Sequence, residues 1–189
     1  MPGRIGSTPA HVPPDAGGGD LEPDPVEIAR EMALRRLEMR DYSRAELAAY
    51  LVRRGAEPEV VDQVLTRLES VGLVDDARFA RSWVDSRRRT KQLSQRALAQ
   101  ELRAKKVDAE VIESALARDD EVDGEGERQL ALQACRARAS RVHGLEHEVA
   151  FRRLAGALAR KGFETSTVVS VVTQVLEELG GGREGNDDF

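Results

Sequence analysis

The chain has 189 residues, of which 40% are hydrophobic, 33% charged and only 4% aromatic, and its formal net charge is −5. No apolar run approaches the roughly 18 residues of a membrane-spanning helix, and so few aromatic residues leave little for a surface that stacks nucleic-acid bases. The acidic net charge, taken for the whole chain, argues against a nucleic-acid partner.

The N-terminal part of the chain predicts a tail followed by two helices. Residues 1–24 are rich in proline, glycine and acids and have almost no apolar periodicity, so we expect a disordered acidic tail. Pro25 suits the first turn of a helix. Ser43 and Glu46 have the spacing of a capping box at the start of a second helix, and Gly55 suits its end.

A third helix is predicted to begin near Pro58 and to end at Gly72. Its buried face is expected to comprise Val61, Val64, Leu65 and Leu68. Asp75 is placed to cap the next helix, in which Phe79 and Trp83 form an i,i+4 aromatic pair. We expect this pair either to pack between two repeats or, as the favoured interpretation, to be plain core residues.

The pattern of this unit recurs twice, first after 51 residues and then after a further 56 residues. Its positions Leu47, Leu51, Arg54, Val61 and Leu65 correspond to Leu98, Leu102, Lys105, Ile112 and Leu116, and then to Leu154, Leu158, Lys161, Val168 and Val172. A long unit repeated three times is typical of a helical array. The valine-rich stretch 168–175 has helical spacing, so we assign it to a helix as well.

We therefore predict an all-α fold, an elongated tandem array of three three-helix, helix-turn-helix-like repeats with disordered termini. The expected divisions are 1–24 for the disordered acidic N-terminal tail, 25–74 for the first repeat, 75–118 for the second repeat, 119–127 for an acidic linker, 128–179 for the third repeat and 180–189 for a disordered acidic tail.

Charge is distributed unevenly over these units. Residues 78–106 contain ten Lys or Arg against two acids, and residues 128–163 contain eight against two. The acids concentrate at the two ends of the chain and in residues 116–127, where six of them stand against one Arg. The basic blocks are either solvated helix faces or a surface for a polyanion, and for residues 78–106 the second interpretation is at least as good.

The sequence shows no active site, so we expect no enzymatic activity and no cofactor. It has no Gly-rich loop ending in Gly-Lys-Ser/Thr, which argues against nucleotide hydrolysis. His143 and His147 lack the further ligands that zinc needs, so we expect no metal site. Cys135 lies in an apolar pattern and is interpreted as a small core residue. A single cysteine and no signal peptide indicate a cytoplasmic protein.

The most specific segment is residues 72–84, Gly-Leu-Val-Asp-Asp-Ala-Arg-Phe-Ala-Arg-Ser-Trp-Val. It resembles the central signature of the RecX family of bacterial recombination regulators. Residues 42–47 (Tyr-Ser-Arg-Ala-Glu-Leu), the pattern around Arg96 and the three-fold array resemble the same family, over residues 26–179 in all. The chain differs from the family pattern at Lys106, where glycine is common, and at residues 93–94, where an aromatic or Gly-containing turn is common.

This resemblance implies a regulatory protein that binds the filament of the RecA recombinase on single-stranded DNA and mainly inhibits it, thereby regulating DNA repair, homologous recombination and the SOS response. We expect a monomer with at most weak direct contact to DNA and none to membranes. We choose the expected contact residues by the clustering of their charges, because no motif fixes individual contacts. They are Arg87, Arg88, Arg89, Lys91, Arg96, Arg103, Lys105 and Lys106, followed by Arg152, Arg153, Arg160 and Lys161.

Two other functions remain open at this point. Three-helix units resemble helix-turn-helix domains, so the chain could act directly on duplex DNA, although such readers often dimerise on half-sites whereas this chain repeats its unit in tandem. A general helical scaffold is also compatible with the repeats, but such a scaffold has no need of the basic block at residues 78–106.

Overall fold

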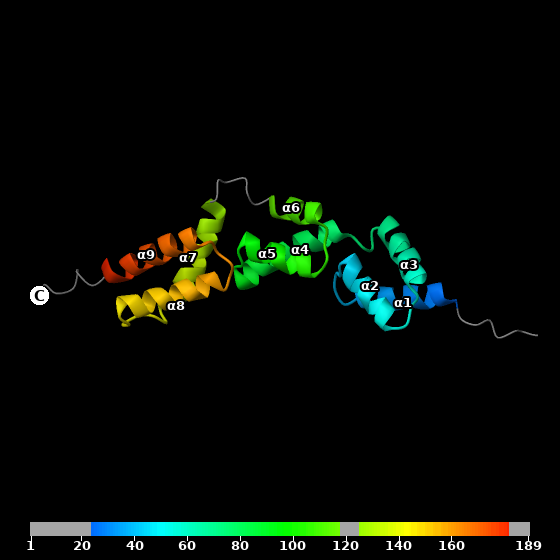
Figure 1. Cartoon of the computed structure of the whole chain (residues 1–189), viewed down its shortest axis with the longest axis horizontal. Coiled ribbons are helices and arrows are strands. Elements are labelled where there is room, and N and C mark those ends of the chain that lie inside the picture. The colour runs from blue at the N-terminus through cyan, green and yellow to red at the C-terminus, as the bar shows by residue number, and fades with distance from the viewer. Residues whose placement is uncertain (1–23, 118–124, 182–189) are drawn as a thin grey trace, which may run out of the picture.

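The computed structural model describes residues 24–117 and 125–181, and these residues form helices joined by short turns (Figure 1). The expectations of disordered tails fall mostly on residues 1–23 and 182–189, which lie outside the described residues, as does most of the predicted linker. Within the described residues, nine helices group into three consecutive units of three, which confirms the predicted all-α repeat array.

The first repeat consists of α1 (Pro25–Leu37), α2 (Arg44–Arg53) and α3 (Pro58–Ser70). Asp24, which was expected in the tail, caps α1 by accepting a hydrogen bond from the amide of Val26 at 2.9 Å. The predicted capping box is present, because the Ser43 hydroxyl accepts from the Glu46 amide and the Glu46 carboxylate accepts from the Ser43 amide. Local sequence signals therefore set the helix starts correctly here.

The second repeat consists of α4 (Asp76–Lys91), α5 (Gln95–Ala104) and α6 (Ala109–Ala117). Gly72 has a φ of +71°, the left-handed conformation expected of a residue that terminates a helix. Asp75 caps α4 by accepting from the Arg78 amide at 2.8 Å, as predicted.

The third repeat consists of α7 (Glu125–Ala139), α8 (His147–Ala159) and α9 (Thr165–Gly181). The valine-rich residues 168–175 are helical, in agreement with their spacing. Two bounds differ from the expected divisions: residues 125–127, assigned to the linker, belong to α7, and residues 180–181, assigned to the tail, belong to α9.

Each repeat has its own hydrophobic core, and the three cores share no residue. The interpretation of Phe79 and Trp83 as core residues is therefore confirmed for Phe79, but neither residue belongs to a core shared between repeats. The two rings stack with centroids 5.7 Å apart, but Phe79 belongs to the core of the second repeat and Trp83 lies half-buried against it. Leucines at equivalent positions, such as Leu47 and Leu98, are fully buried in their own repeats, so contacts other than shared core residues must join the units.

The first joint between repeats connects the start of α2 to the end of α5. The Ser43 hydroxyl donates to the carbonyl oxygen of Lys105 at 3.0 Å while it still caps α2. The Arg44 amide, also in the first turn of α2, donates to the Asp76 carboxylate at 2.8 Å. Two donors of one helix start are thus satisfied by the next repeat.

The second joint repeats this arrangement one unit further along the chain. The Ser94 amide at the start of α5 donates to the carbonyl oxygen of Lys161 at 3.0 Å, just after α8. Gly162, with a φ of +88°, leaves no room for a side chain, because a Cβ built there would lie 2.6 Å from the Ser94 hydroxyl oxygen and 2.8 Å from the Ala97 Cβ. The repeated joint arranges the units as an elongated array (Figure 1).

The position equivalent to Gly162 in the second repeat is Lys106, which also has a left-handed backbone, with a φ of +56°. The other departure from the family pattern, at residues 93–94, directly follows Gln92, whose φ is +52°. Both turns therefore keep the conformation that glycine usually supplies, with a non-glycine residue in the left-handed region.

Candidate functional site

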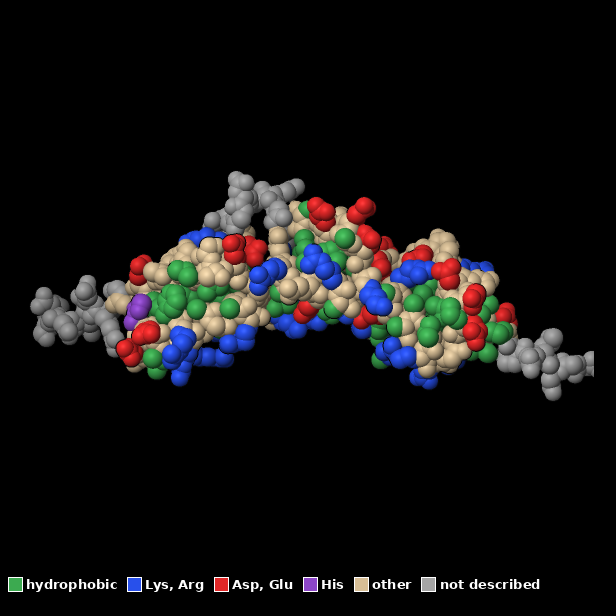
Figure 2. Space-filling model, viewed as in Figure 1, with side chains coloured by type: hydrophobic (Ala, Val, Ile, Leu, Met, Phe, Trp, Pro, Cys, Tyr) green, Lys and Arg blue, Asp and Glu red, His purple; other side chains and the backbone are tan. Residues whose placement is uncertain are grey.

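Charge is sorted by helix within each repeat. The third helices α3, α6 and α9 contain seven acids and a single basic residue, Arg67, among them. The described Lys and Arg side chains of the second and third repeats lie on their first and second helices or in the turns that follow these helices. In Figure 2 blue side chains line much of the lower, concave edge of the molecule, and red side chains gather toward the upper edge.

Arg87 makes its contacts within the second repeat. Its guanidinium donates to the Glu101 carboxylate at 2.9 Å and lies 3.9 Å from the centroid of the Trp83 ring. The indole nitrogen of Trp83 donates to the same carboxylate at 2.8 Å. Burial opposes the charged form of Glu101, but the Arg87 and Trp83 hydrogen bonds outweigh it and lower the pKa of Glu101. Arg87 therefore stabilises a network on the repeat core.

Lys105 belongs to the first joint. Its ammonium binds the Glu46 carboxylate at 2.6 Å and lies 4.1 Å from the centroid of the Trp83 ring. Only 17% of the Lys105 side chain is exposed. The ammonium thus links the second repeat to the first and has little surface left for a partner.

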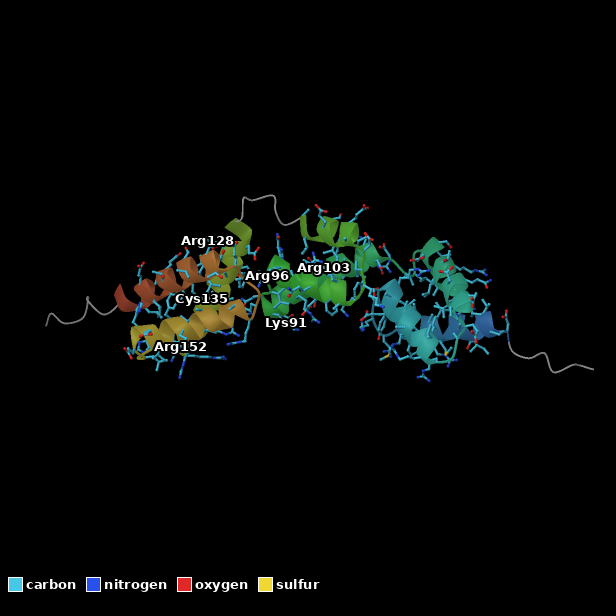
Figure 3. The ribbon with its side chains drawn as sticks, viewed as in Figure 1. Lys91, Arg96, Arg103, Arg128, Cys135 and Arg152 are labelled. Atoms are coloured by element: carbon cyan, nitrogen blue, oxygen red, sulfur yellow. The ribbon has the colours of Figure 1, made fainter. Side chains whose placement is uncertain are left out.

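Lys161 and Lys91 meet at the second joint. The Lys161 ammonium donates to the carbonyl oxygen of Lys91. Burial, together with the nearby Arg138 charge, lowers the pKa of Lys161. The Lys91 ammonium lies 3.6 Å from the Glu101 carboxylate but remains exposed, and Figure 3 places Lys91 on the lower edge.

A second group of the expected contact residues is exposed. Within residues 24–117 and 125–181, no ion pair involves Arg89, Arg96, Arg103 or Lys106. Figure 3 shows Arg96 and Arg103 at mid-height on α5, between the two edges. Arg88 is half-buried and interacts with other residues of the chain. The set chosen from charge clustering thus divides into residues that hold the array together and residues that face solvent.

The remaining three expected residues, Arg152, Arg153 and Arg160, line a cavity of about 490 Å³ in the third repeat. Arg138 and Arg141, near the end of α7, complete a set of five arginines that we call the arginine groove. No acidic residue lines it. Arg138 and Arg141 were missed from sequence because they stand apart from the α8 group along the chain, although both fall inside the basic block 128–163.

The arginine groove continues toward the second joint. An adjoining hollow of about 340 Å³ shares Arg138 and Arg160 with it and is also lined by Lys91 and Lys161. The two hollows together connect the third repeat to the end of α4, over a surface whose charged lining residues are all basic.

Three other features would bear on function: a metal site, a reactive cysteine and a membrane-spanning helix. No group of three or more His, Cys, Asp or Glu side chains that could hold a metal ion occurs among them. Cys135 is buried in the core of the third repeat, and burial raises the pKa of its thiol to about 11, so the nucleophilic thiolate is scarce at neutral pH. None of the described helices has the length and apolar character needed to cross a membrane.

Two segments match known protein families. Residues 29–68 match the family described as the first three-helix domain of RecX, and residues 75–116 match its second three-helix domain. These matches coincide with the first two repeats of the structure.

Curated relatives and solved structures extend the likeness to most of the chain. The chain is 41% identical over 174 residues to a protein named regulatory protein RecX from Streptomyces coelicolor, covering 90% of each chain. It is 46% identical over 156 residues to the regulatory protein RecX of Mycobacterium marinum, covering 82% of this chain and 88% of the relative.

The crystal structure of RecX from Lactobacillus salivarius shares the fold, with a TM-score of 0.69 at 17% identity over 80% of this chain and 97% of that chain. A second crystal structure of regulatory protein RecX gives a TM-score of 0.67 at 22% identity, over 78% of this chain and 71% of that chain. The sequence identity to the curated relatives carries the assignment, and the structures add the shared fold. The chain belongs to the RecX family of regulatory proteins.

Proposed function

We propose that this protein binds the RecA recombinase filament assembled on single-stranded DNA and inhibits its activity. It acts as a monomeric, non-enzymatic regulator in the cytoplasm. The observation that carries the proposal, beside family membership, is the separation of charge along an elongated array. A repeating array presents the same kind of surface at regular intervals, which suits a partner that is itself a repeating polymer.

The division of the basic residues refines the expected contact set. Lys105 and Lys161 make contacts at the joints between repeats, and Arg87 stabilises the Trp83–Glu101 network within the second repeat, so these three have structural roles. Arg89, Arg96, Arg103 and Lys106 are exposed without ion pairs in the described part of the chain, and they are the contact residues that we assign in the second repeat.

Direct reading of duplex DNA is the weaker alternative. A helix-turn-helix domain places its recognition helix in the major groove, beside the phosphates. The third helix of the repeat corresponds to that recognition helix in chain order, and α6 and α9 contain no Lys or Arg at all. Acidic helices of this kind would be repelled by DNA, which favours the filament-binding function.

The test is inhibition of recombinase ATP hydrolysis on single-stranded DNA. We expect the wild-type chain to inhibit and the triple variant Arg89→Gln, Arg96→Gln, Arg103→Gln to inhibit at least tenfold less at equal concentration. The matched control is Arg35→Gln, which removes an exposed arginine ion-paired with Glu31 in the first repeat. Equal inhibition by the triple variant and the wild type would move the contact elsewhere, and no inhibition by the wild type would overturn the proposal.

A further inference from the structure

We propose that the arginine groove of the third repeat binds the phosphodiester backbone of a nucleic-acid strand, independently of base sequence. For its role on a filament the inference rests on the proposed function. The site itself is argued from its own geometry and is testable without recombinase.

The groove is built from two helices that pack together. Arg138 comes from the end of α7 and Arg141 from the turn that follows, whereas Arg152 and Arg153 are neighbours in α8. Arg160 follows α8 and closes the set. Side chains that are distant in sequence therefore converge on one hollow.

None of these arginines has an ion-pair partner within residues 24–117 and 125–181. Their neighbour Arg136 shows the usual arrangement, because it binds the Glu178 carboxylate of α9 at 2.8 Å. Five guanidinium groups around a hollow repel one another, which disfavours the folded state in the absence of an anion. A bound anion removes that repulsion, so the arrangement indicates an anionic ligand.

Gly156 adds a second observation at the same place. It lies inside α8, where glycine is about 0.5–1 kcal/mol less favourable than alanine. It lines the groove, and a Cβ built there would lie 3.4 Å from the Arg160 Nη1 atom, an ordinary van der Waals contact, so the position has room for a side chain. The helix thus has a residue of low helix propensity in the wall of the groove although a larger side chain would fit there, which keeps this part of the groove open.

The lining favours phosphate over an acidic protein surface. The apolar lining residues Val142, Leu154 and Ala157 are buried, so the groove offers no exposed anchor of the kind that dominates protein interfaces. Guanidinium groups match phosphate oxygens in a two-point geometry. No aromatic side chain lines the groove for base stacking, and therefore the contacts are to the backbone and carry no sequence information.

The shape favours a strand over a single phosphate. The basic surface runs from the groove through the adjoining hollow to Lys91, across the second joint. A chain of regularly spaced phosphates can occupy such a surface with several charges at once, and binding then depends steeply on salt through the release of counterions.

The experiment measures binding of a fluorescent 20-nucleotide oligothymidylate by anisotropy, over a series of salt concentrations. For the double variant Arg152→Gln, Arg153→Gln we expect at least tenfold weaker binding. We also expect the slope of log K against log salt to flatten by about 1.4, which corresponds to two single-strand phosphate contacts. The control Arg136→Gln removes a paired arginine of α7 and should bind like the wild type. Equal affinities and slopes for the double variant and the wild type would overturn the site.

A second variant separates binding from folding. Gly156→Glu places a carboxylate among the arginines and replaces a helix-interior glycine, so we expect higher thermal stability together with loss of oligonucleotide binding. Retained binding in this variant would contradict the inference. A poly-glutamate peptide that bound as tightly as the oligonucleotide, with the same sensitivity to Arg152 and Arg153, would reassign the groove to a protein partner.

Failure of this inference is distinguishable from failure of the proposed function. If the wild-type chain inhibits recombinase but binds no oligonucleotide, the proposed function holds and the nucleic-acid site in the arginine groove is refuted. If the chain binds the oligonucleotide through the five arginines but leaves recombinase unaffected, the nucleic-acid site holds and the proposed function is refuted.

Discussion

The hydroxyl of Ser43 makes two hydrogen bonds, and one of them joins it to the carbonyl oxygen of Lys105, 62 residues further along the chain. As an acceptor the hydroxyl caps α2, and as a donor it connects the first repeat to the second. The equivalent serine at the second joint, Ser94, caps α5 with its hydroxyl but makes the joint with its backbone amide. The shape of the array thus depends on residues whose sequence signal is only that of a helix cap.

Replacing the two serines separates the cap from the joint. Ser94→Ala removes a cap and should cost about 1 kcal/mol of unfolding free energy. Ser43→Ala removes a cap and also leaves the Lys105 carbonyl without this donor, so we expect about 1 kcal/mol more. Urea unfolding of the two variants gives the difference, and equal costs would show that the Ser43–Lys105 bond contributes nothing.

Gly162 and Gly55 allow a similar separation of backbone strain from close approach. Both have left-handed backbones, with φ of +88° and +92°, but only Gly162 lies against another repeat. Gly55→Ala should cost about 1–2 kcal/mol, the usual penalty for a Cβ in this conformation. We expect Gly162→Ala to cost more and to increase the radius of gyration in solution scattering, because the added Cβ pushes against Ser94 and Ala97. Identical effects of the two changes would argue against a tight second joint.

Lys106 adopts a left-handed backbone although it carries a Cβ. Lys106→Gly should therefore raise the unfolding free energy by about 0.5–1 kcal/mol, since the strain relieved exceeds the entropy that glycine adds to the unfolded chain. The change is measured by urea unfolding. Lys161, which does not have a left-handed backbone, stays unchanged in this variant. A destabilised variant would show that the Lys106 side chain itself supports the joint.

The Glu46–Lys105 ion pair gives the first joint a dependence on acid. Burial opposes ionisation of Glu46, but hydrogen bonding and attraction to Lys105, with help from the Ser43 amide, lower its pKa below the ordinary 4.5. Because the folded pKa lies below the unfolded pKa, this stabilisation is complete above the unfolded value and is lost as the pH falls through the folded value.

Glu46→Gln keeps an N3 side chain suited to the capping box but removes the charge, so its unfolding free energy should fall less steeply than that of the wild type below about pH 4.5. The control is Glu148→Gln, an exposed residue of α8 with no ion-pair partner in the described part of the chain. If Glu46→Gln and the wild type lose stability in parallel on acidification, the ion pair does not stabilise the joint.

The sequence was sufficient for the features that depend on near neighbours. Helix caps at Ser43 and Asp75, the turn at Gly72 and the three-fold apolar pattern all arise within a few residues, and the structure confirms each of them. The sequence identified Phe79 and Trp83 as a pair and as core residues, and the structure shows that they stack in and against the core of the second repeat. Periodicity locates a buried face without saying which core receives it, so the alternative of packing between repeats stayed open until the structure placed the pair.

The division of the basic residues was not predictable in the same way. Lys105 and Arg89 belong to the same basic block, yet Lys105 binds Glu46 across the first joint whereas Arg89 is exposed to solvent. That difference depends on pairing between residues tens of positions apart, which charge counting does not contain. The convergence of Arg138 with Arg152 likewise depends on how α7 and α8 pack, and only the folded chain shows it.

The most direct measurement is a cryo-electron microscopy map of the protein on a recombinase filament assembled on single-stranded DNA. We expect density for the three-repeat array in which α4, α5 and α8 face the filament, while the acidic α3, α6 and α9 face solvent. A map with α3, α6 and α9 against the filament, or with no density for this chain under saturating conditions, would contradict the proposed function.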